Sequence, residues 1–349
     1  MDKDFFQIQL VQTADKGDMN DKWEQLLSEF HKLGGIAENV CQEKVECGRG
    51  ICSINPHRRS RIYTPSRLMI KKDDIYLEGN KIRIKKDREY NQNIRDFFSF
   101  YQDNFSWGAG GKVSTEFFEK GLNKFPSELK GLIKKYTSFD LEERHRGNWN
   151  EVIKEQFLNS RAAIYAKDSV LVPMFELVNH DVISLSFIST IDGLSTPYYP
   201  PFSGELTFSY NNMSALKRFF LYGFFSKETM VFSIPFKLDV KDLGFKLHCK
   251  GMNLYNDSIN LNRSDNIITI EGLPIADVNH SRLPSYYFDE IIRRVDSVNI
   301  PKDILSKIFE LNIFVRRKIM EKSYSPANQV SSLLSEIMDY EITLISSYN

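Results

Sequence analysis

Along its length the sequence alternates between segments whose residues favour short strands and segments whose residues have helical spacing. This alternation constrains the fold more than any other feature. Residues 36 to 84 hold short runs of β-branched and aromatic residues broken by glycine and proline, which predicts short strands joined by turns. Residues 88 to 160 have helical spacing, strand texture returns from 168 to 236, and the remainder is mainly helical. The chain therefore predicts an α+β protein.

The textures divide the chain into four predicted segments. Residues 1–87 hold an N-terminal helix and the first part of a β-rich core, 88–160 a helical insertion, 161–236 the second part of the core, and 237–349 a mainly helical C-terminal lobe. The amphipathic helix is expected at Asp21 to Leu33. A hairpin is expected within Phe245 to Gly272, from the polar-apolar alternation of SINLNRSDNIITIEG, residues 258–272. Three apolar stripes, at 288–295, 304–315 and 330–337, predict three helices in the lobe.

The composition excludes several classes of protein. Lysine plus arginine equals aspartate plus glutamate at 46 each, so no whole-chain field attracts nucleic acid or an anionic membrane. Because no secretory signal or membrane-spanning apolar stretch is recognisable, we expect a cytoplasmic protein; a nuclear location or export by another route stays open. The four cysteines match no zinc spacing, which predicts buried thiols and no metal site. The sequence does not indicate an oligomeric state.

Two glycine-rich segments are weak signals when taken alone. CGRGIC, residues 47–52, fits an ordinary β-turn whose glycines take positive φ. WGAGGK, residues 107–112, lacks the spacing of phosphate-binding motifs and predicts a flexible loop.

The tripeptide Val-Asn-His occurs twice, at residues 178–180 and 278–280. The first copy ends the apolar run LVPMFELVNH and precedes GELTFSY, residues 204–210. The second copy lies between two prolines, where a solvated turn is expected. Only the first copy is therefore a candidate for a functional site.

Tyr210 ends a segment in which alternate side chains share one face. In ELTFSY the side chains of Leu206, Phe208 and Tyr210 fall on the same side of a strand, so the phenol is expected to point inward. A core tyrosine whose hydroxyl bonds a backbone group is the alternative interpretation of this residue.

Taken in order, CGRGIC, LVPMFELVNH, GELTFSY and FFLYGFF (residues 219–225) resemble the SET-domain protein methyltransferases. The resemblance runs from about Gly34 to Phe236. It is greatest to the branch typified by Rubisco large-subunit lysine methyltransferase and the actin-histidine methyltransferase, in which an insertion splits the SET fold and a helical lobe follows. It implies an enzyme that uses S-adenosylmethionine and methylates a protein substrate docked by the lobe.

The resemblance also implies a role for particular residues. The turn at Gly48, Arg49 and Gly50 would approach the methionine part of the cofactor, and Arg161 would bind its carboxylate. Asn179 and His180 would hold the adenosine portion and the chain crossing beneath it, and Tyr210 would be the catalytic residue at the cofactor. The rings of Tyr222 and Phe224 would wall the amine channel. The alternatives are a surface ion pair for Arg161, a hydrogen-bonded core histidine for His180, and core packing for the two rings.

The sequence departs from the family pattern at a few positions. Glu176 stands where the family often has aspartate, and Asn211 where it usually has glycine. Histidine methylation in this branch uses an asparagine and an arginine at the positions of Ala163 and Met213, so lysine is the favoured target. One alternative is a histidine-directed enzyme. The other is a SET-fold protein-binding module that has lost methyl transfer, in which Glu176 and Asn211 would be the first substitutions to follow the loss of activity. A nucleic-acid binder is disfavoured because no basic, aromatic-interleaved stripe was found.

Overall fold

A computed structural model describes residues 16–45, 48–210, 213–240, 245–251, 260–279, 284–286, 288–289, 303–325 and 327–348. The chain forms two compact units, and neither is continuous in sequence. The first, here the N-terminal unit, comprises Met1–Phe117, Gly147–Asn211 and Leu221–Gly223. The second, here the C-terminal unit, comprises Phe118–Arg146, Asn212–Phe220 and Phe224–Asn349.

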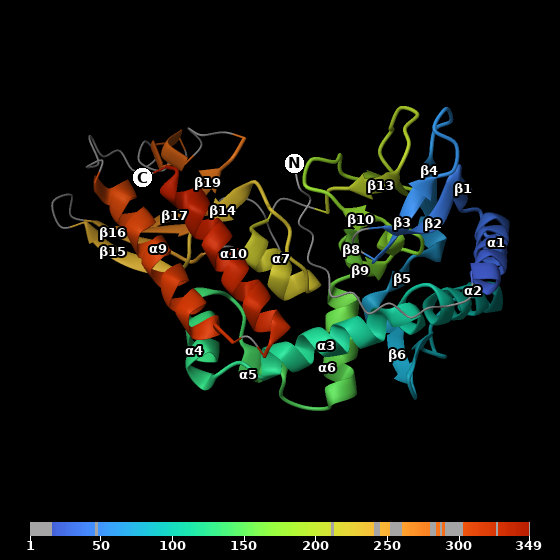
Figure 1. Cartoon of the computed structure of the whole chain (residues 1–349), viewed down its shortest axis with the longest axis horizontal. Helices are drawn as coiled ribbons and strands as arrows, with labels where there is room; N and C mark the ends of the chain where they lie inside the picture. Colours follow the sequence, from blue (N-terminus) through green and yellow to red (C-terminus); the bar gives the residue numbers. More distant parts are fainter. Residues whose placement is uncertain are drawn as a thin grey trace. The chain divides into compact units, whose positions relative to one another are not determined.

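Short strands dominate the N-terminal unit (Figure 1). They are β1 (Ile36–Glu38), β2 (Val40–Val45), β3 (Gly48–Ser53), β4 (Arg61–Pro65), β5 (Ile70–Lys71), β6 (Ile75–Glu78), β7 (Lys81–Ile84), β8 (Ala162–Tyr165), β9 (Asp168–Leu171), β10 (Asn179–His180), β11 (Ile188–Thr190), β12 (Gly193–Ser195) and β13 (Glu205–Phe208). They pair in the orders β1-β4-β12-β11, β10-β13-β3-β2, β5-β9-β8 and β6-β7. The sheets therefore combine strands from both sides of the helical insertion.

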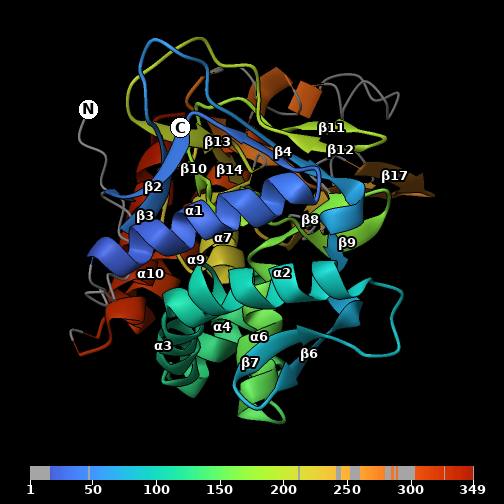
Figure 2. The same ribbon diagram turned by 90° about the vertical axis from the view of Figure 1, so that its right-hand side faces the viewer.

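The helices of this unit are α1 (Lys16–Lys32), α2 (Gln92–Asn104) and α6 (Trp149–Asn159), while α3 (Lys112–Asn123) and α7 (Ala215–Tyr222) each cross the division between the units. Asn91 begins α2 by accepting a hydrogen bond from the Ile94 amide. Figure 2 shows α1 and α2 side by side. Phe30 of α1 stacks on Phe97 of α2 with ring centroids 5.9 Å apart, so the apolar face predicted for the first helix covers the second.

The core of the N-terminal unit is formed by side chains from its helices and sheets together. Its fully buried members include Leu26, Phe30, Ile51, Ile62, Tyr101, Phe157 and Leu171. Removing this much apolar surface from water is the main source of stability for such a unit, at about 25 cal/mol per Å².

The C-terminal unit contains α4 (Ser127–Tyr136), α5 (Leu141–Arg144), α9 (Asp303–Ser323) and α10 (Gln329–Ser346). Its strands are β14 (Met230–Phe232), β15 (Phe236–Val240), β16 (Phe245–Cys249), β17 (Asn260–Ser264), β18 (Ile267–Glu271) and β19 (Pro274–Asp277). They form sheets of order β15-β16-β18-β17 and β14-β19. Helices α9 and α10 lie side by side (Figure 1), joined by a buried ion pair of 2.8 Å between Arg316 and Glu341.

The α+β class predicted from the sequence is confirmed by these sheets and helices. The expected hairpin is β17 and β18, and the second and third apolar stripes of the lobe lie on α9 and α10. The first stripe lies outside the described residues except for 288–289. The four segment boundaries remain predictions.

Two local predictions were wrong. The region 168–236 was expected to have the composition of strands, but residues 215–222 form α7, a short helix on which Leu216, Phe219 and Phe220 are buried. The segment WGAGGK was expected to be a flexible loop, yet residues 107–111 form a kinked turn, with non-helical backbone at Ala109 and Gly110, that leads directly into α3. Gly110 has a φ of 109° inside this turn, which a glycine adopts without strain.

Candidate active site

The register of β13 brings the sequence motifs together. On one side β13 pairs in parallel with β10, so that Asn179 lies opposite Thr207 and His180 opposite Phe208. On its other side β13 pairs with β3, where Glu205 lies opposite Cys52. The strand of the GELTFSY segment therefore separates the first Val-Asn-His copy from the strand that begins at the glycine turn.

Asn179 connects the glycine turn to β13. Its Nδ2 atom donates to the carbonyl oxygen of Arg49 at 3.2 Å and to Oε1 of Glu205 at 2.6 Å. A Cβ at Gly50 would lie 2.3 Å from the same Glu205 oxygen, so only glycine fits there without displacing the carboxylate. Gly48 has a φ of 113°, as a turn would require, but Gly50 does not. Gly48, Arg49 and Gly50 lie on β3 and pair with β2, so the expectation of an ordinary β-turn at these three residues was wrong.

The side chain of Arg49 turns away from Asn179 and donates through Nη2 to the carbonyl oxygen of Ala109, in the helical turn before α3. Burial lowers the pKa of Arg49. The two glycine-rich segments of the sequence are thus in direct contact, although neither showed this from its own pattern.

His180 and Tyr210 form the second part of the site. The amide of Tyr210 donates to Nδ1 of His180 at 3.1 Å, an arrangement that leaves the proton of the neutral imidazole on Nε2. The Tyr210 hydroxyl donates to the carbonyl oxygen of Val178 at 2.9 Å. His180 is a buried, hydrogen-bonded histidine and Tyr210 has a backbone partner, as the alternative interpretations of both residues expected, and these contacts place the two rings 5.1 Å apart.

Aromatic rings continue from Tyr210 in two directions. Its ring centroid is 5.3 Å from that of Phe208 and 5.4 Å from that of Tyr222, at the end of α7. Phe224 belongs to the C-terminal unit, where the Arg218 guanidinium lies 6.0 Å from its ring centroid. A shared channel of Tyr222 and Phe224 therefore stays a prediction.

Arg161 lies directly after α6, and its guanidinium sits 4.1 Å from the ring centroid of Phe157. Its Nε atom is 3.8 Å from Oε2 of Glu176, and the two side chains are 26% and 1% exposed. Because the carboxylate is buried, this pair is not the surface ion pair that was the alternative for Arg161. Burial lowers the pKa of Arg161, while the nearby Glu176, Tyr210 and Tyr101 oppose that shift.

Glu176 is held by polar side chains around α2. Its carboxylate accepts hydrogen bonds from Ser106 Oγ at 2.7 Å and Gln102 Nε2 at 3.0 Å. Burial raises the pKa of Glu176, and the Arg161 charge and these hydrogen bonds only partly offset that effect. The insertion therefore contributes directly to the surroundings of Arg161.

Sequence reasoning missed the part that Glu176 and Glu205 play in this arrangement. Both are acids within otherwise apolar, strand-like runs, and a charged residue in such a run is seldom buried without a partner. That signal was available in LVPMFELVNH and GELTFSY, but the partners of the two carboxylates depend on the tertiary fold.

The second Val-Asn-His copy lies in the C-terminal unit and forms a turn as far as it is described. The Val278 amide donates to the Thr229 carbonyl at 2.8 Å, and the Asn279 amide donates to Oδ1 of Asp277 at 2.9 Å. His280 lies outside the described residues.

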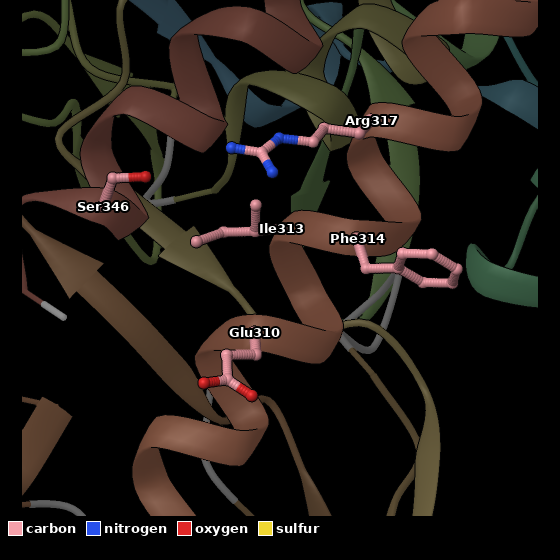
Figure 3. Close-up of a pocket in the computed structure, with 5 residues that line it drawn as sticks. All are labelled: Glu310, Ile313, Phe314, Arg317 and Ser346. Carbon is pink, nitrogen blue, oxygen red and sulfur yellow. The ribbon is translucent and has the colours of Figure 1, made fainter.

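The described residues were also compared with the requirements of a metal site, a membrane-spanning helix and a ligand pocket. Among the residues that the structure describes, no group of histidine, cysteine, aspartate and glutamate is arranged to hold a metal ion. Within the same residues, every helix is too short or too polar to cross a membrane. A hollow on α9 and α10 is lined by Glu310, Ile313, Phe314, Arg317 and Ser346, with Phe314 extending away from the others (Figure 3). None of the sequence-predicted site residues lines it.

No protein-family model matches the chain, and no curated protein does. Solved structures do resemble it over most of its length. The SET domain of LSMT bound to lysine and AdoHcy is 12% identical, with a TM-score of 0.46, over 94% of this chain and 90% of that one. Rubisco LSMT bound to sinefungin and monomethyllysine is 13% identical, with a TM-score of 0.44, over 93% and 90%. Both belong to the branch named by the sequence resemblance, and at these values the likeness transfers no residue role.

Proposed function

We propose that this protein is an S-adenosylmethionine-dependent protein N-methyltransferase whose target is a lysine side-chain amine. The observation that carries the proposal is the position of β13. Tyr210, two residues after this strand, donates its amide to His180, while the first residue of the strand, Glu205, accepts from Asn179, which also bonds Arg49 of β3. The sequence resemblance assigns these groups to a single ligand, and that assignment requires them to be neighbours.

The residues suit the cofactor in two respects. The Arg161 guanidinium is fixed by Phe157 and Glu176 yet partly exposed, so its planar fork can receive a carboxylate. On β3, Gly50 leaves room for the Glu205 carboxylate that holds Asn179, a residue that the resemblance assigns to the cofactor. When bound, S-adenosylmethionine would supply a methyl group already activated by its sulfonium.

Tyr210 would orient the amine. Its hydroxyl proton is committed to the Val178 carbonyl, so the phenolic oxygen presents its lone pairs and can accept an N–H from the incoming amine. A group fixed in this way contributes by alignment, and no strong general base is needed.

The amine also has to be uncharged to act as a nucleophile. A lysine with a pKa of about 10.4 requires about 4.6 kcal/mol to be neutral at pH 7. The rings of Phe208, Tyr210 and Tyr222 would exclude water from the amine, and burial lowers the pKa of an ammonium group. The aromatic neighbours of Tyr210 therefore act in the direction that methyl transfer needs.

Lysine is favoured over histidine as the target. Ala163 on β8 and the buried Met213 are apolar, and they stand where the resemblance requires an asparagine and an arginine for histidine methylation. The inactive-module alternative relies on Asn211, outside the described residues, and on Glu176. The organised contacts of Glu176 beside Arg161 favour the enzyme.

Titration calorimetry with S-adenosylmethionine tests the proposal. The full chain is expected to show a single saturable site, and Arg161→Met is expected to weaken it about tenfold or more, because a charge-assisted contact is lost. Arg146→Met is the matched control, since this arginine is 74% exposed and pairs with Glu143 on the surface. A wild-type chain without saturable binding would contradict the enzyme and leave the binding module.

Labelled methyl donor and cell lysate then identify the target. The full chain is incubated with both, and the labelled residue is mapped by mass spectrometry. Label on lysine supports the proposal. Label on histidine would reassign the target without affecting the cofactor site.

A further inference from the structure

The loop between β3 and β4 carries a cluster of exposed cations. Arg58, Arg59 and Arg61 lie within four consecutive residues, and all three are exposed. In the part of the chain that the structure describes, none of their guanidinium groups forms an ion pair, although Glu38 lies opposite Arg61 in the register of β1 and β4. Surface arginines are usually only solvated, so further observations have to distinguish this cluster.

Asn39 makes several of the hydrogen bonds that hold the backbone of this loop. Asn39, in a left-handed conformation with a φ of 55°, donates through Nδ2 to the carbonyl oxygens of Asn55 and Arg58, each at 3.0 Å. Its Oδ1 accepts from the Asn55 amide at 2.8 Å, and the Ser60 hydroxyl donates to its backbone carbonyl at 3.0 Å. Because the loop is fixed before a partner arrives, binding requires less ordering of the backbone.

One of the arginines is also fixed at its side chain. The Arg59 guanidinium carbon lies 4.2 Å from the ring centroid of Tyr198, which is 72% exposed. The two loops that carry these residues rise side by side in both views, blue for the arginines and yellow-green for Tyr198 (Figures 1 and 2). A stacked guanidinium keeps its N–H edge free to solvent in the plane that a carboxylate recognises.

We propose that Arg58, Arg59, Arg61 and Tyr198, here the basic patch, form a docking surface for an acidic segment of a protein partner. The unpaired guanidinium groups favour carboxylates by charge, and Ile54, 63% exposed beside them, offers apolar contact at the edge. A nucleic acid is the weaker fit, because such sites neutralise many phosphates along a duplex or strand and this chain has no net charge.

The patch lies away from Tyr210, the residue proposed to act in the chemistry. It follows the end of β3 at which the Ser53 amide donates to the Gly204 carbonyl, and Tyr210 is six residues further along that second segment. At about 3.3 Å per residue, the segment from Gly204 to Tyr210 is about 20 Å long where it is extended, whereas Glu205 is next to Gly204. The basic patch would therefore act on binding and not on chemistry, and it stands whether or not the protein transfers a methyl group.

Fluorescence anisotropy on the full chain with a labelled hexaglutamate peptide tests this proposal. We expect saturable binding that weakens with salt, and a loss of about tenfold or more in the triple variant Arg58→Gln, Arg59→Gln, Arg61→Gln, since each exposed pair contributes modestly. The matched control is Lys86→Gln, Lys124→Gln, Lys135→Gln, which removes the same charge elsewhere and is expected to stay within about twofold. Asn39→Gly keeps the left-handed backbone but releases the loop, and an intermediate loss is expected.

Three results would overturn the proposal. The triple arginine variant could bind hexaglutamate as well as the wild type does. The lysine control could lose as much affinity as the arginine variant, which would reduce the effect to net charge. A single-stranded oligouridylate could bind more tightly than the peptide at equal salt and depend on the same arginines, which would assign the patch to nucleic acid. None of these measurements requires S-adenosylmethionine, so their failure is distinct from failure of the proposed function.

Discussion

The hydroxyls of Tyr210 and Tyr199 make the same kind of bond, and of these two only Tyr210 is placed at the proposed site. Tyr210 donates to the Val178 carbonyl at 2.9 Å, and Tyr199 donates to the Thr207 carbonyl at 2.8 Å. We expect Tyr210→Phe to lower turnover about tenfold or more, because the amine loses its acceptor, while cofactor affinity in calorimetry changes only a few fold. Tyr199→Phe loses an equivalent hydrogen bond and should leave turnover nearly unchanged. Equal effects of the two variants would remove Tyr210 from the mechanism.

A substitution at Gly50 tests the part of the site formed by Glu205 and Asn179. Alanine there would place its Cβ 2.3 Å from Glu205 Oε1, push the carboxylate off Asn179, and destabilise the protein by about 1–3 kcal/mol. Cofactor affinity should fall with it, since Asn179 loses its partner. Gly131→Ala is the control: it lies within α4 with nothing near its Cβ position, and should stabilise the protein by about 0.5–1 kcal/mol. Urea denaturation and calorimetry measure both effects, and an unchanged Gly50→Ala protein would contradict the packing described for the turn.

At the scale of elements, Glu176 ties the chain before β10 to α2. Burial raises the pKa of Glu176 above its ordinary value of 4.5, so the native protein binds this proton at a higher pH than the unfolded chain does. From 4.5 up to the raised value, the wild type therefore loses stability as pH rises, because the native state must ionise a buried carboxyl. Arg161 and Tyr101 are the titratable groups that face this carboxyl.

The variant Glu176→Gln has no such proton. Its free energy of unfolding should therefore increase relative to that of the wild type as the pH is raised from 4.5 to neutral, which urea denaturation at each pH measures. Glu89→Gln, at an exposed position, serves as the control. Parallel pH profiles for wild type and Glu176→Gln would show that the carboxyl titrates normally in the native protein.

Elements with a strong local period were predictable from the sequence. The stripe of the first helix, the 258–272 hairpin, and the stripes of α9 and α10 all follow from spacing alone. The helix at 215–222 was missed because a short apolar run has no decisive period, and the turn at 107–111 because its conformation depends on contacts elsewhere, such as Arg49 with Ala109. The sequence motifs identified Asn179, His180 and Tyr210 as candidates. The partners of the Glu176 and Glu205 carboxylates could not be predicted, because they come from segments that only the tertiary fold brings together.

At the scale of the whole molecule, the chain passes between its two units more than once. The C-terminal unit includes residues 118–146 and 212–220, which precede the lobe that texture predicted to begin at 237. Within that unit, Lys322 of α9 pairs with Glu128 of α4 at 3.0 Å, and Asn328 donates to the Gly121 carbonyl at 2.9 Å. Glu341 of α10 accepts from the Leu216 amide at 3.0 Å, at the start of α7. The unit is therefore built from both halves of the sequence.

A chain cut after Phe236 should for this reason fail to fold as a shorter enzyme. It would keep α4 and α7 but lose α9 and α10, exposing side chains that are fully buried in the whole chain, including Leu129, Ile133, Phe219 and Phe220. We expect such a fragment to bind a hydrophobic dye, to self-associate in size-exclusion chromatography, and to lack a sharp thermal transition in circular dichroism. The full chain is the control in each measurement. A monomeric fragment with a cooperative transition and unaltered cofactor affinity would mean that residues 118–146 and 212–220 do not need the lobe, and that a continuous C-terminal domain describes the molecule better.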